Sequence, residues 1–319
     1  MRHCLFLLAA LMMAGPTAAA LMMAGPTAAG ESTVNAGGFP ATLSATDAHG
    51  PLVVMVAGSG PTDRDGNNPF GVRAGYLRKL ASTLAERGFA SLRYDKRGLL
   101  GSVPAGDEAD VDFDTFVADL EAVVGWARGA YPDRGLILLG HSEGGMVAIE
   151  AARRAPDAYC GLVLLATPGR PPGDMLRDQL TGLPEPVADE AKVILAMLEA
   201  GRRVDAVPQA LAGVFRASVQ PFVISMLKLR PAAALGALDL PTLVIGGGMD
   251  VQVKRADFDA LAVARPGIAN RWYETMNHVL VDAPADFAGN VATYGDADAV
   301  LTDGLAEAVA DFAKRVDRQ

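Results

Sequence analysis

The sequence predicts an α/β fold in which helices flank a mostly parallel central sheet. Short runs that are apolar on both faces alternate with segments of helical spacing, a pattern typical of buried parallel strands and their connecting helices. Half of the 319 residues are hydrophobic and a fifth are charged, which indicates a globular chain rather than a disordered one. We therefore expect ligands to bind at the edge of the sheet where the parallel strands end.

The beginning of the chain has the layout of a secretory signal peptide. Arg2 precedes an apolar run, and small residues follow it. The decamer ALMMAGPTAA occurs twice, at residues 10–19 and 20–29. Small residues allow cleavage after Ala20 or after Ala29, and we prefer the second position.

An uncleaved membrane anchor is the weaker alternative for this leader. Gly15 and Pro16 interrupt the apolar run well short of the roughly 20 residues that a span needs. We expect residues 1–29 to be removed and the protein to be exported, either periplasmic or secreted, without a stable membrane span. Removal of Cys4 with the leader leaves Cys160 alone, so the mature chain is expected to form no internal disulfide.

Six apolar runs are the candidate strands. They span residues 51–58, 89–95, 135–140, 161–168, 241–247 and 268–274. Helical spacing is found between or after them, at residues 74–88, 113–130, 144–155 and 303–316. In the first of these helices, Leu77, Leu80 and Leu84 share one face.

Residues 171–235 break the alternation of strands and helices. This segment contains several prolines and helical patches but no good strand, so we predict a helical cap over the carboxyl edge of the sheet. Residues 30–170 and 236–319 then form the core. Apolar cap residues such as Met175 and Met226 are candidates for the cap's own core or for an acyl pocket.

The motif G-x-S-x-G lies between a predicted strand and a predicted helix, in Gly140-His141-Ser142-Glu143-Gly144. Such a turn is sharp, and glycines two residues away on each side avoid a collision with the serine. The serine hydroxyl is then presented at the edge of the sheet and at the N-terminus of a helix, where backbone N–H groups favour a developing oxyanion. This context predicts that Ser142 is a nucleophile.

A nucleophilic serine needs a base, and the mature chain offers three histidines. His49 precedes the first core strand, far from the carboxyl edge. His141 adjoins Ser142, but the turn directs its side chain away. His278 follows the last strand, so elimination makes it the predicted base.

The base needs an acid that fixes its tautomer. Asp250 follows a buried strand and three glycines. The resulting chain order of Ser142, Asp250 and His278 matches a known arrangement of serine, acid and histidine. The alternative for Asp250 is a helix cap or turn aspartate.

Two backbone N–H groups are predicted to bind the oxyanion. Ser59, in the glycine-rich loop after the first core strand, supplies one, and Glu143, next to the nucleophile, supplies the other. The alternative for Ser59 is a plain turn residue. For the Glu143 carboxylate we favour pairing with a nearby arginine over contact with a cationic substrate.

Charged residues occur in the loop that contains Ser59 and in the loop after the predicted strand at residues 89–95. Asp63, Arg64 and Asp65 are expected to hold the oxyanion loop by charge-assisted hydrogen bonds, with binding of substrate or a metal as the alternative. Lys96 and Arg97 are expected to do similar structural work.

These motifs resemble those of α/β-hydrolase-fold serine hydrolases, in particular an exported bacterial esterase-like branch. The resemblance covers the chain from about Pro51 to its end and is carried, in order, by AGSGPTDRDGNN, RYDKRGLLGS, GHSEGG, GGGMDVQV and MNHVL. It implies an α/β-hydrolase fold with Ser142 as nucleophile, Asp250 as acid and His278 as base. Two departures stand out: Ala57 takes the place of a histidine common in relatives, and the first hairpin, at residues 37–50, looks abbreviated.

The sequence thus predicts a serine hydrolase that cleaves carboxylic esters through an acyl-enzyme, with no cofactor and no metal. The alternatives are a peptidase or amidase, or a thioesterase or acyltransferase, on the same three residues. A non-catalytic binding module is a distant one. A net charge of −9 without a basic run argues against nucleic acid as a partner, so we expect a small-molecule ester as the substrate. The oligomeric state is not encoded in these motifs.

Overall fold

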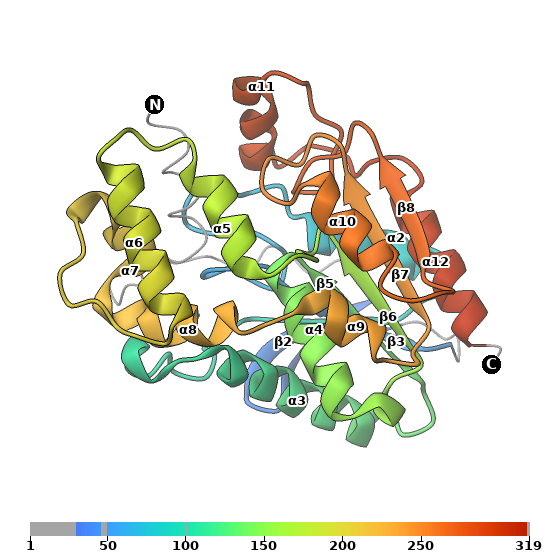
Figure 1. The fold of residues 1–319 in the computed structure, drawn as a ribbon. Helices are drawn as coiled ribbons and strands as arrows, with labels where there is room; N and C mark the ends of the chain where they lie inside the picture. Colours follow the sequence, from blue (N-terminus) through green and yellow to red (C-terminus); the bar gives the residue numbers. More distant parts are fainter. Residues whose placement is uncertain (1–29, 46–49, 100, 318–319) are drawn as a thin grey trace.

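The computed structural model describes residues 30–45, 50–99 and 101–317. The predicted signal peptide, both of its cleavage positions and His49 lie outside the described residues. The fold places helices on both sides of one central sheet (Figure 1).

Eight strands form the sheet in the order β1-β2-β4-β3-β5-β6-β7-β8. The strands β3 to β8 are parallel, and β1 and β2 join them antiparallel. Their bounds are β1 Glu31–Ala36, β2 Phe39–Ser44, β3 Leu52–Val56, β4 Ser91–Tyr94, β5 Leu136–His141, β6 Gly161–Leu165, β7 Thr242–Gly247 and β8 Ala269–Tyr273. All six strands predicted from apolar runs are confirmed.

The N-terminal hairpin corrects the sequence prediction. Instead of an abbreviated hairpin within residues 37–50, β1 and β2 pair over six residues each, from Glu31 opposite Ser44 to Ala36 opposite Phe39. Most side chains of the edge strand β1 are at least partly exposed, so it lacks the apolar run that marks the other strands.

Two helical layers enclose the sheet, and the side chains of each strand point alternately to one layer and to the other. In β3, Leu52 and Val54 face the layer that contains α3 and α4, whereas Val53 and Met55 face α2 and α12. The helices of these layers are α2 Tyr76–Glu86, α3 Phe113–Ala130, α4 Glu143–Arg154, α10 Arg255–Ala262 and α12 Leu305–Val316. The bounds of α3 coincide with the predicted residues 113–130.

Five α-helices lie between β6 and β7, where the sequence predicts a helical cap. They are α5 Pro172–Leu180, α6 Val187–Glu199, α7 Ala212–Phe215, α8 Gln220–Leu227 and α9 Pro231–Gly236. Figure 1 shows α5 to α8 grouped beside the sheet layer. Phe222 of α8 anchors this group, because its ring packs against the rings of Phe113 and Phe116 of α3.

One stretch of the cap is apolar and long enough to cross a membrane by composition. Residues Gln209–Gly236 have a mean hydropathy of 1.4 in their most apolar window, half of which is buried inside the protein. The structure divides this stretch into α7, α8, α9 and the short 3-10 turns Gln209–Leu211 and Ala217–Val219. Burial of cap helices accounts for its apolar character.

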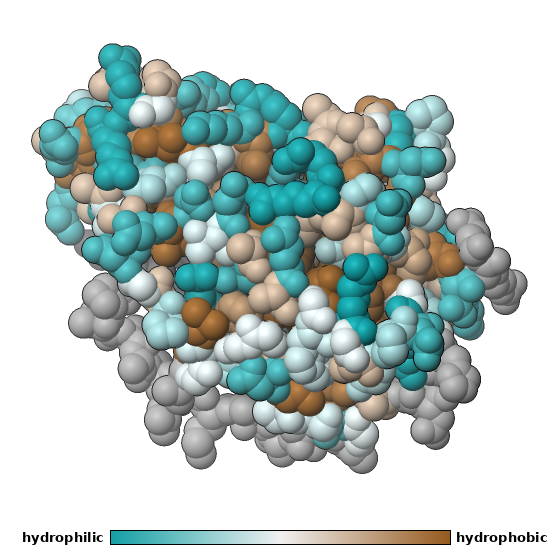
Figure 2. Space-filling model, turned by 90° about the horizontal axis from the view of Figure 1, so that it is seen from below, coloured by the Kyte–Doolittle hydropathy of each residue, from teal (hydrophilic) through white to brown (hydrophobic). Residues whose placement is uncertain are grey.

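Short helical elements complete the chain. A helix α11, Phe287–Ala292, and a 3-10 turn, Thr293–Gly295, lie between β8 and α12 and were not predicted. Two further 3-10 turns span Glu108–Asp110 and Pro156–Ala158. Figure 2 shows hydrophilic residues spread among smaller hydrophobic areas on the lower face of the molecule.

Candidate active site

Ser142 occupies the turn between β5 and α4. Its backbone has φ 54° and ψ −122°, a conformation that side chains rarely adopt. A Cβ atom at Gly140 would collide with the backbone of Gly144 and Gly145, and one at Gly144 would collide with carbonyl oxygens at the end of β3. The glycines are therefore needed for the turn to close, as the motif predicts.

Asp250 and His278 meet at the carboxyl edge of the sheet. Nδ1 of His278 lies 2.8 Å from Oδ2 of Asp250, and both side chains are buried. The other carboxylate oxygen, Oδ1, accepts the backbone N–H groups of Gln252 and Val253 at 2.7 and 2.9 Å. The Asp250 carboxylate is thus fixed on one side by its own loop and faces the imidazole on the other.

The loop that carries His278 is held by α11. Asn277 is fully buried, and its amide donates to Oδ1 of Asn290 and to Oγ1 of Thr293. Asn290 in turn donates to the backbone carbonyl of Met249, next to Asp250. The helix α11 therefore ties the His278 loop to the Asp250 loop.

His141 is not placed to act as the base. Its Nδ1 lies 3.0 Å from the hydroxyl of Tyr76, and its Nε2 lies 2.8 Å from the carbonyl oxygen of His278. Because a carbonyl oxygen only accepts, Nε2 carries the hydrogen and Nδ1 accepts from the tyrosine. Burial, together with the nearby His278, lowers the pKa of His141 well below its usual range, so the ring is neutral.

This contact places His278 beside the residue that precedes Ser142. The rings of His141 and His278 have centroids 4.7 Å apart. Among the described residues, no hydrogen bond joins Oγ of Ser142 to His278. Such bonds are often long without substrate and tighten when substrate binds.

The loop after β3 lies against the serine. A Cβ atom at Gly58 would lie 3.3 Å from Cβ of Ser142. Nζ of Lys96 donates to the carbonyl oxygen of Gly58 at 3.0 Å. Because the carbonyl and N–H groups of a trans peptide point in opposite directions, the N–H of Ser59 points away from Lys96. The N–H of Glu143 belongs to the first turn of α4, where N–H groups have no partner within the helix.

The carboxylate of Glu143 pairs with a lysine, not with the arginine that the sequence analysis favoured. Nζ of Lys96 lies 3.0 Å from Oε1, and both side chains are more than nine-tenths buried. Nζ also lies 4.7 Å from the ring centroid of Phe116. Lys96 lies in the loop just after β4, which places it next to the β3 loop.

The charged residues of the loop after β3 are held by hydrogen bonds, as predicted. Arg64 pairs with Asp95, with Nη2 2.6 Å from Oδ2. Asp63 accepts the backbone N–H groups of Asp65 and Asn67. Burial is the main reason that the pKa of Asp63 rises from 3.8 to about 6.

The prediction that Arg97 helps to hold the loop after β3 is wrong. Its guanidinium pairs with Asp119 of α3 rather than with the loop after β3. Lys96 alone of the two reaches that loop, because its side chain is directed to the carbonyl oxygen of Gly58.

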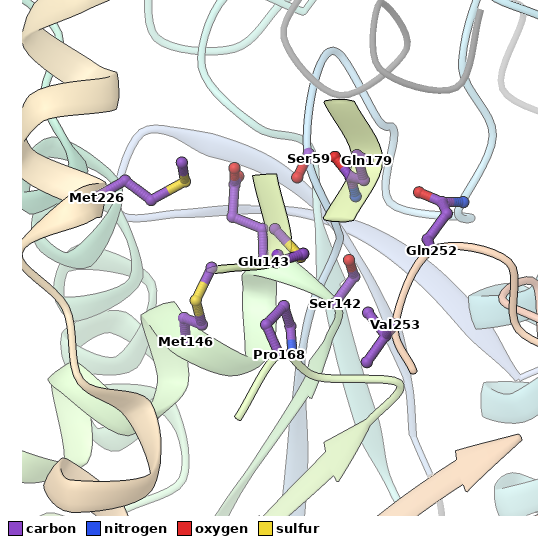
Figure 3. Close-up of a pocket in the computed structure, with 10 residues that line it drawn as sticks. Ser59, Ser142, Glu143, Met146, Pro168, Gln179, Met226, Gln252 and Val253 are labelled. Carbon is purple, nitrogen blue, oxygen red and sulfur yellow. The ribbon is translucent and has the colours of Figure 1, made fainter. Parts of the chain in front are cut away.

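A small pocket opens at Ser142 (Figure 3). Its volume is about 290 Å³, including the part open to solvent. The lining residues are Ser59, Ser142, Glu143, Met146, Pro168, Met175, Gln179, Met226, Gln252 and Val253. Two of the predicted cap candidates, Met175 and Met226, therefore reach the pocket.

Sequence reasoning missed the two glutamines of this pocket. Gln179 comes from α5 of the cap, and Gln252 follows Asp250 by two residues. Neither belongs to a motif, so no signal in the sequence alone marked them. Within the part of the chain that the structure describes, no group of three or more His, Cys, Asp or Glu side chains is arranged to hold a metal ion.

A mostly parallel eight-stranded sheet, flanked by helices and carrying a sharp strand–serine–helix turn, defines the α/β-hydrolase fold. Residues 70–284 match the Hydrolase_4 family, described as serine aminopeptidase, S33. The chain belongs to this family. No curated protein matches the sequence.

Solved structures share this fold at low sequence identity. Est1E from Butyrivibrio proteoclasticus, with bound ferulic acid, is 17% identical with a TM-score of 0.58, over 89% of this chain and 96% of that one. An esterase from Pyrococcus furiosus is 16% identical with a TM-score of 0.57, over 92% and 95%. A proline iminopeptidase from Mycobacterium smegmatis is 17% identical with a TM-score of 0.51, over 90% and 99%. At such identities the likeness concerns the fold.

Proposed function

We propose that this hydrolase is an exported serine esterase that cleaves small carboxylic esters through an acyl-enzyme. The observation that carries the proposal is the 2.8 Å contact between His278 and Asp250, beside a serine held at positive φ. This is the arrangement expected of a base, its orienting acid and a nucleophile that lines a pocket.

In the proposed reaction, Nε2 of His278 takes the proton from Ser142 as Oγ attacks the ester carbonyl. The N–H groups of Ser59 and Glu143 stabilise the tetrahedral oxyanion. The alcohol then leaves with the proton from His278, and water repeats the sequence to release the acid. Asp250 keeps the hydrogen of His278 on Nδ1, which leaves Nε2 free to act as the base.

Two features favour an ester with a small acyl group. The pocket is small, and half of its ten lining residues are apolar, including three methionines. The carboxylate of Glu143, the one acidic group of the pocket lining, is already paired with Lys96 and is poorly suited to bind a free amino terminus.

A peptidase is the second candidate, and the description of the family as serine aminopeptidase favours it. Peptide and ester cleavage use the same nucleophile, base and acid, so the site alone does not separate them. Export is proposed on the layout of residues 1–29, which predicts passage to the periplasm or the medium.

The test is hydrolysis by the protein that starts at Gly30, with Ser142→Ala as the blank. Nitrophenyl esters from acetyl to lauryl are compared with aminoacyl nitroanilides. We expect turnover of short esters that disappears in the variant. Anilide turnover above ester turnover would favour the peptidase, and identical traces for both proteins would exclude a serine hydrolase.

A further inference from the structure

Gln179 carries a buried acceptor without a partner. Its Oε1 is shielded from solvent and makes no hydrogen bond to any described residue. A buried polar atom left unpaired costs about 1–3 kcal/mol, so such atoms are rare in folded proteins and call for an explanation.

The position of Gln179 suggests which partner Oε1 could bind. The residue lies on the cap helix α5, and its side chain lines the same pocket as Ser142 and Ser59. In Figure 3, Gln179 and Ser59 are both drawn above Ser142, among the residues that line the pocket. A substrate whose carbonyl is attacked by Ser142 would bring its neighbouring atoms under this amide.

The charges around the pocket indicate whether the neighbouring group of that substrate is charged or neutral. Glu143 is the one charged residue among those that line it, and its carboxylate is paired with Lys96. An ammonium group would therefore find no free counter-charge there, and a buried unpaired charge is strongly disfavoured. An uncharged donor such as a hydroxyl needs only an acceptor, which Oε1 of Gln179 offers.

From these observations we infer that the substrate carries a hydroxyl group close to its scissile carbonyl, and that Gln179 accepts a hydrogen bond from it. The inference rests on the proposed hydrolase function and specifies its substrate class as hydroxylated esters. Gln179 is then a specificity-determining residue of the cap, and it binds a polar group of the substrate.

The test compares esters that differ in one group. Ethyl butyrate is the plain reference, ethyl 3-hydroxybutyrate places a hydroxyl on the acyl side, and 2-hydroxyethyl butyrate places it on the alcohol side. Ethyl 3-aminobutyrate supplies an ammonium instead. Release of acid is followed by titration for the wild type, Gln179→Met and Gln252→Met. Gln252→Met is the matched control, because it replaces a glutamine of the same pocket by methionine. The amide of Gln252 already has a partner, since its Nε2 donates to the hydroxyl of Tyr294.

We expect the wild type to prefer one hydroxylated ester over ethyl butyrate by roughly 10- to 100-fold in kcat/KM, and Gln179→Met to abolish that preference. Gln252→Met should change the rates of all esters alike and leave the preference in place. Whichever of the two hydroxylated esters is preferred shows whether the hydroxyl group lies on the acyl side or on the alcohol side of the carbonyl.

Three outcomes would overturn the inference. The first is equal loss on plain and hydroxylated esters in Gln179→Met, as expected if a water molecule satisfies the amide. The second is no wild-type preference for a hydroxyl, and the third is a preference for the ammonium ester. In all three, Ser142-dependent cleavage of ethyl butyrate leaves the proposed function intact. Failure of the wild type to cleave any ester of the panel would remove both.

Discussion

The ammonium group of Lys96 lies 3.0 Å from the carboxylate of Glu143, in a pair that is almost completely buried. The same ammonium group binds the carbonyl oxygen of Gly58. The two peptide groups proposed to hold the oxyanion, at Ser59 and Glu143, are thus joined through one lysine. Removing Lys96 should disturb the oxyanion site without touching the nucleophile.

The first prediction concerns Lys96→Met. We expect kcat on a short nitrophenyl ester to fall by roughly 10- to 100-fold with little change in KM, somewhat less than the loss of a whole oxyanion donor. The single variant also leaves a buried carboxylate unpaired, at a cost of about 3–5 kcal/mol in stability.

A second variant separates these two effects. Lys96→Met combined with Glu143→Gln removes both charges and keeps the backbone N–H of residue 143. Thermal unfolding should show its stability largely restored while kcat stays low. A double variant with wild-type kcat would show that Lys96 serves stability alone.

The second prediction concerns Asp250→Asn. The amide would still accept the backbone N–H groups of its loop through one oxygen, but its NH₂ group would face Nδ1 of His278. The imidazole would then hold its hydrogen on Nε2, the wrong tautomer for a base. We expect kcat to fall by roughly 10³- to 10⁴-fold while thermal unfolding changes little. A loss of less than tenfold would remove Asp250 from the proposed mechanism.

The third prediction concerns Gly144→Ala. The new methyl group would collide with the carbonyl oxygens of Val56 and Ala57, which are backbone atoms that cannot rotate away. We expect lower stability and loss of ester hydrolysis, because the oxyanion loop must move away from Ser142. Gly125→Ala is the matched control: it lies on an exposed turn of α3 with open space around it and should gain about 0.5–1 kcal/mol. Equal stability of both variants would contradict the collision.

The fourth prediction is a pH dependence that arises from Asp63. Its pKa is raised from 3.8 to about 6 in the folded protein, mainly by burial. Between these values the folded state keeps a proton that the unfolded state has lost. The contribution of Asp63 to stability is therefore present below about pH 4 and is lost as the pH rises through 6.

Asp63→Asn removes this titration. The free energy of unfolding in urea, measured for both proteins from pH 4 to pH 7.5, should show a wild-type advantage that shrinks by at most about 3 kcal/mol over that range. A difference between the two proteins that stays constant with pH would refute the raised pKa.

Much of the fold could be predicted because its strands are apolar on both faces. The six core strands and the helix at residues 113–130 stand out by periodicity alone. The edge strand β1 could not be found in this way, because its stability comes from pairing with β2 and from the buried contact of Glu31 with Arg93.

The site, like the fold, could be predicted only in part. The meeting of Asp250 and His278 could be predicted because few histidines are available and the carboxyl ends of parallel strands share one edge. The partner of Glu143 could not, since Lys96 lies 47 residues earlier in the chain and only the adjacency of two loops brings them together. Gln179 was also missed, because its place in the pocket depends on which way the cap helix α5 faces.

The positive φ of Ser142 has a consequence for the stability of this chain. The backbone at that position suits glycine better than serine, since glycine adopts such angles without strain. Exchange of Ser142 for glycine would therefore relieve the backbone strain while it removes the hydroxyl group. The turn thus holds the serine at some cost to the stability of the folded chain, and only the chemistry of its hydroxyl group gains from that arrangement.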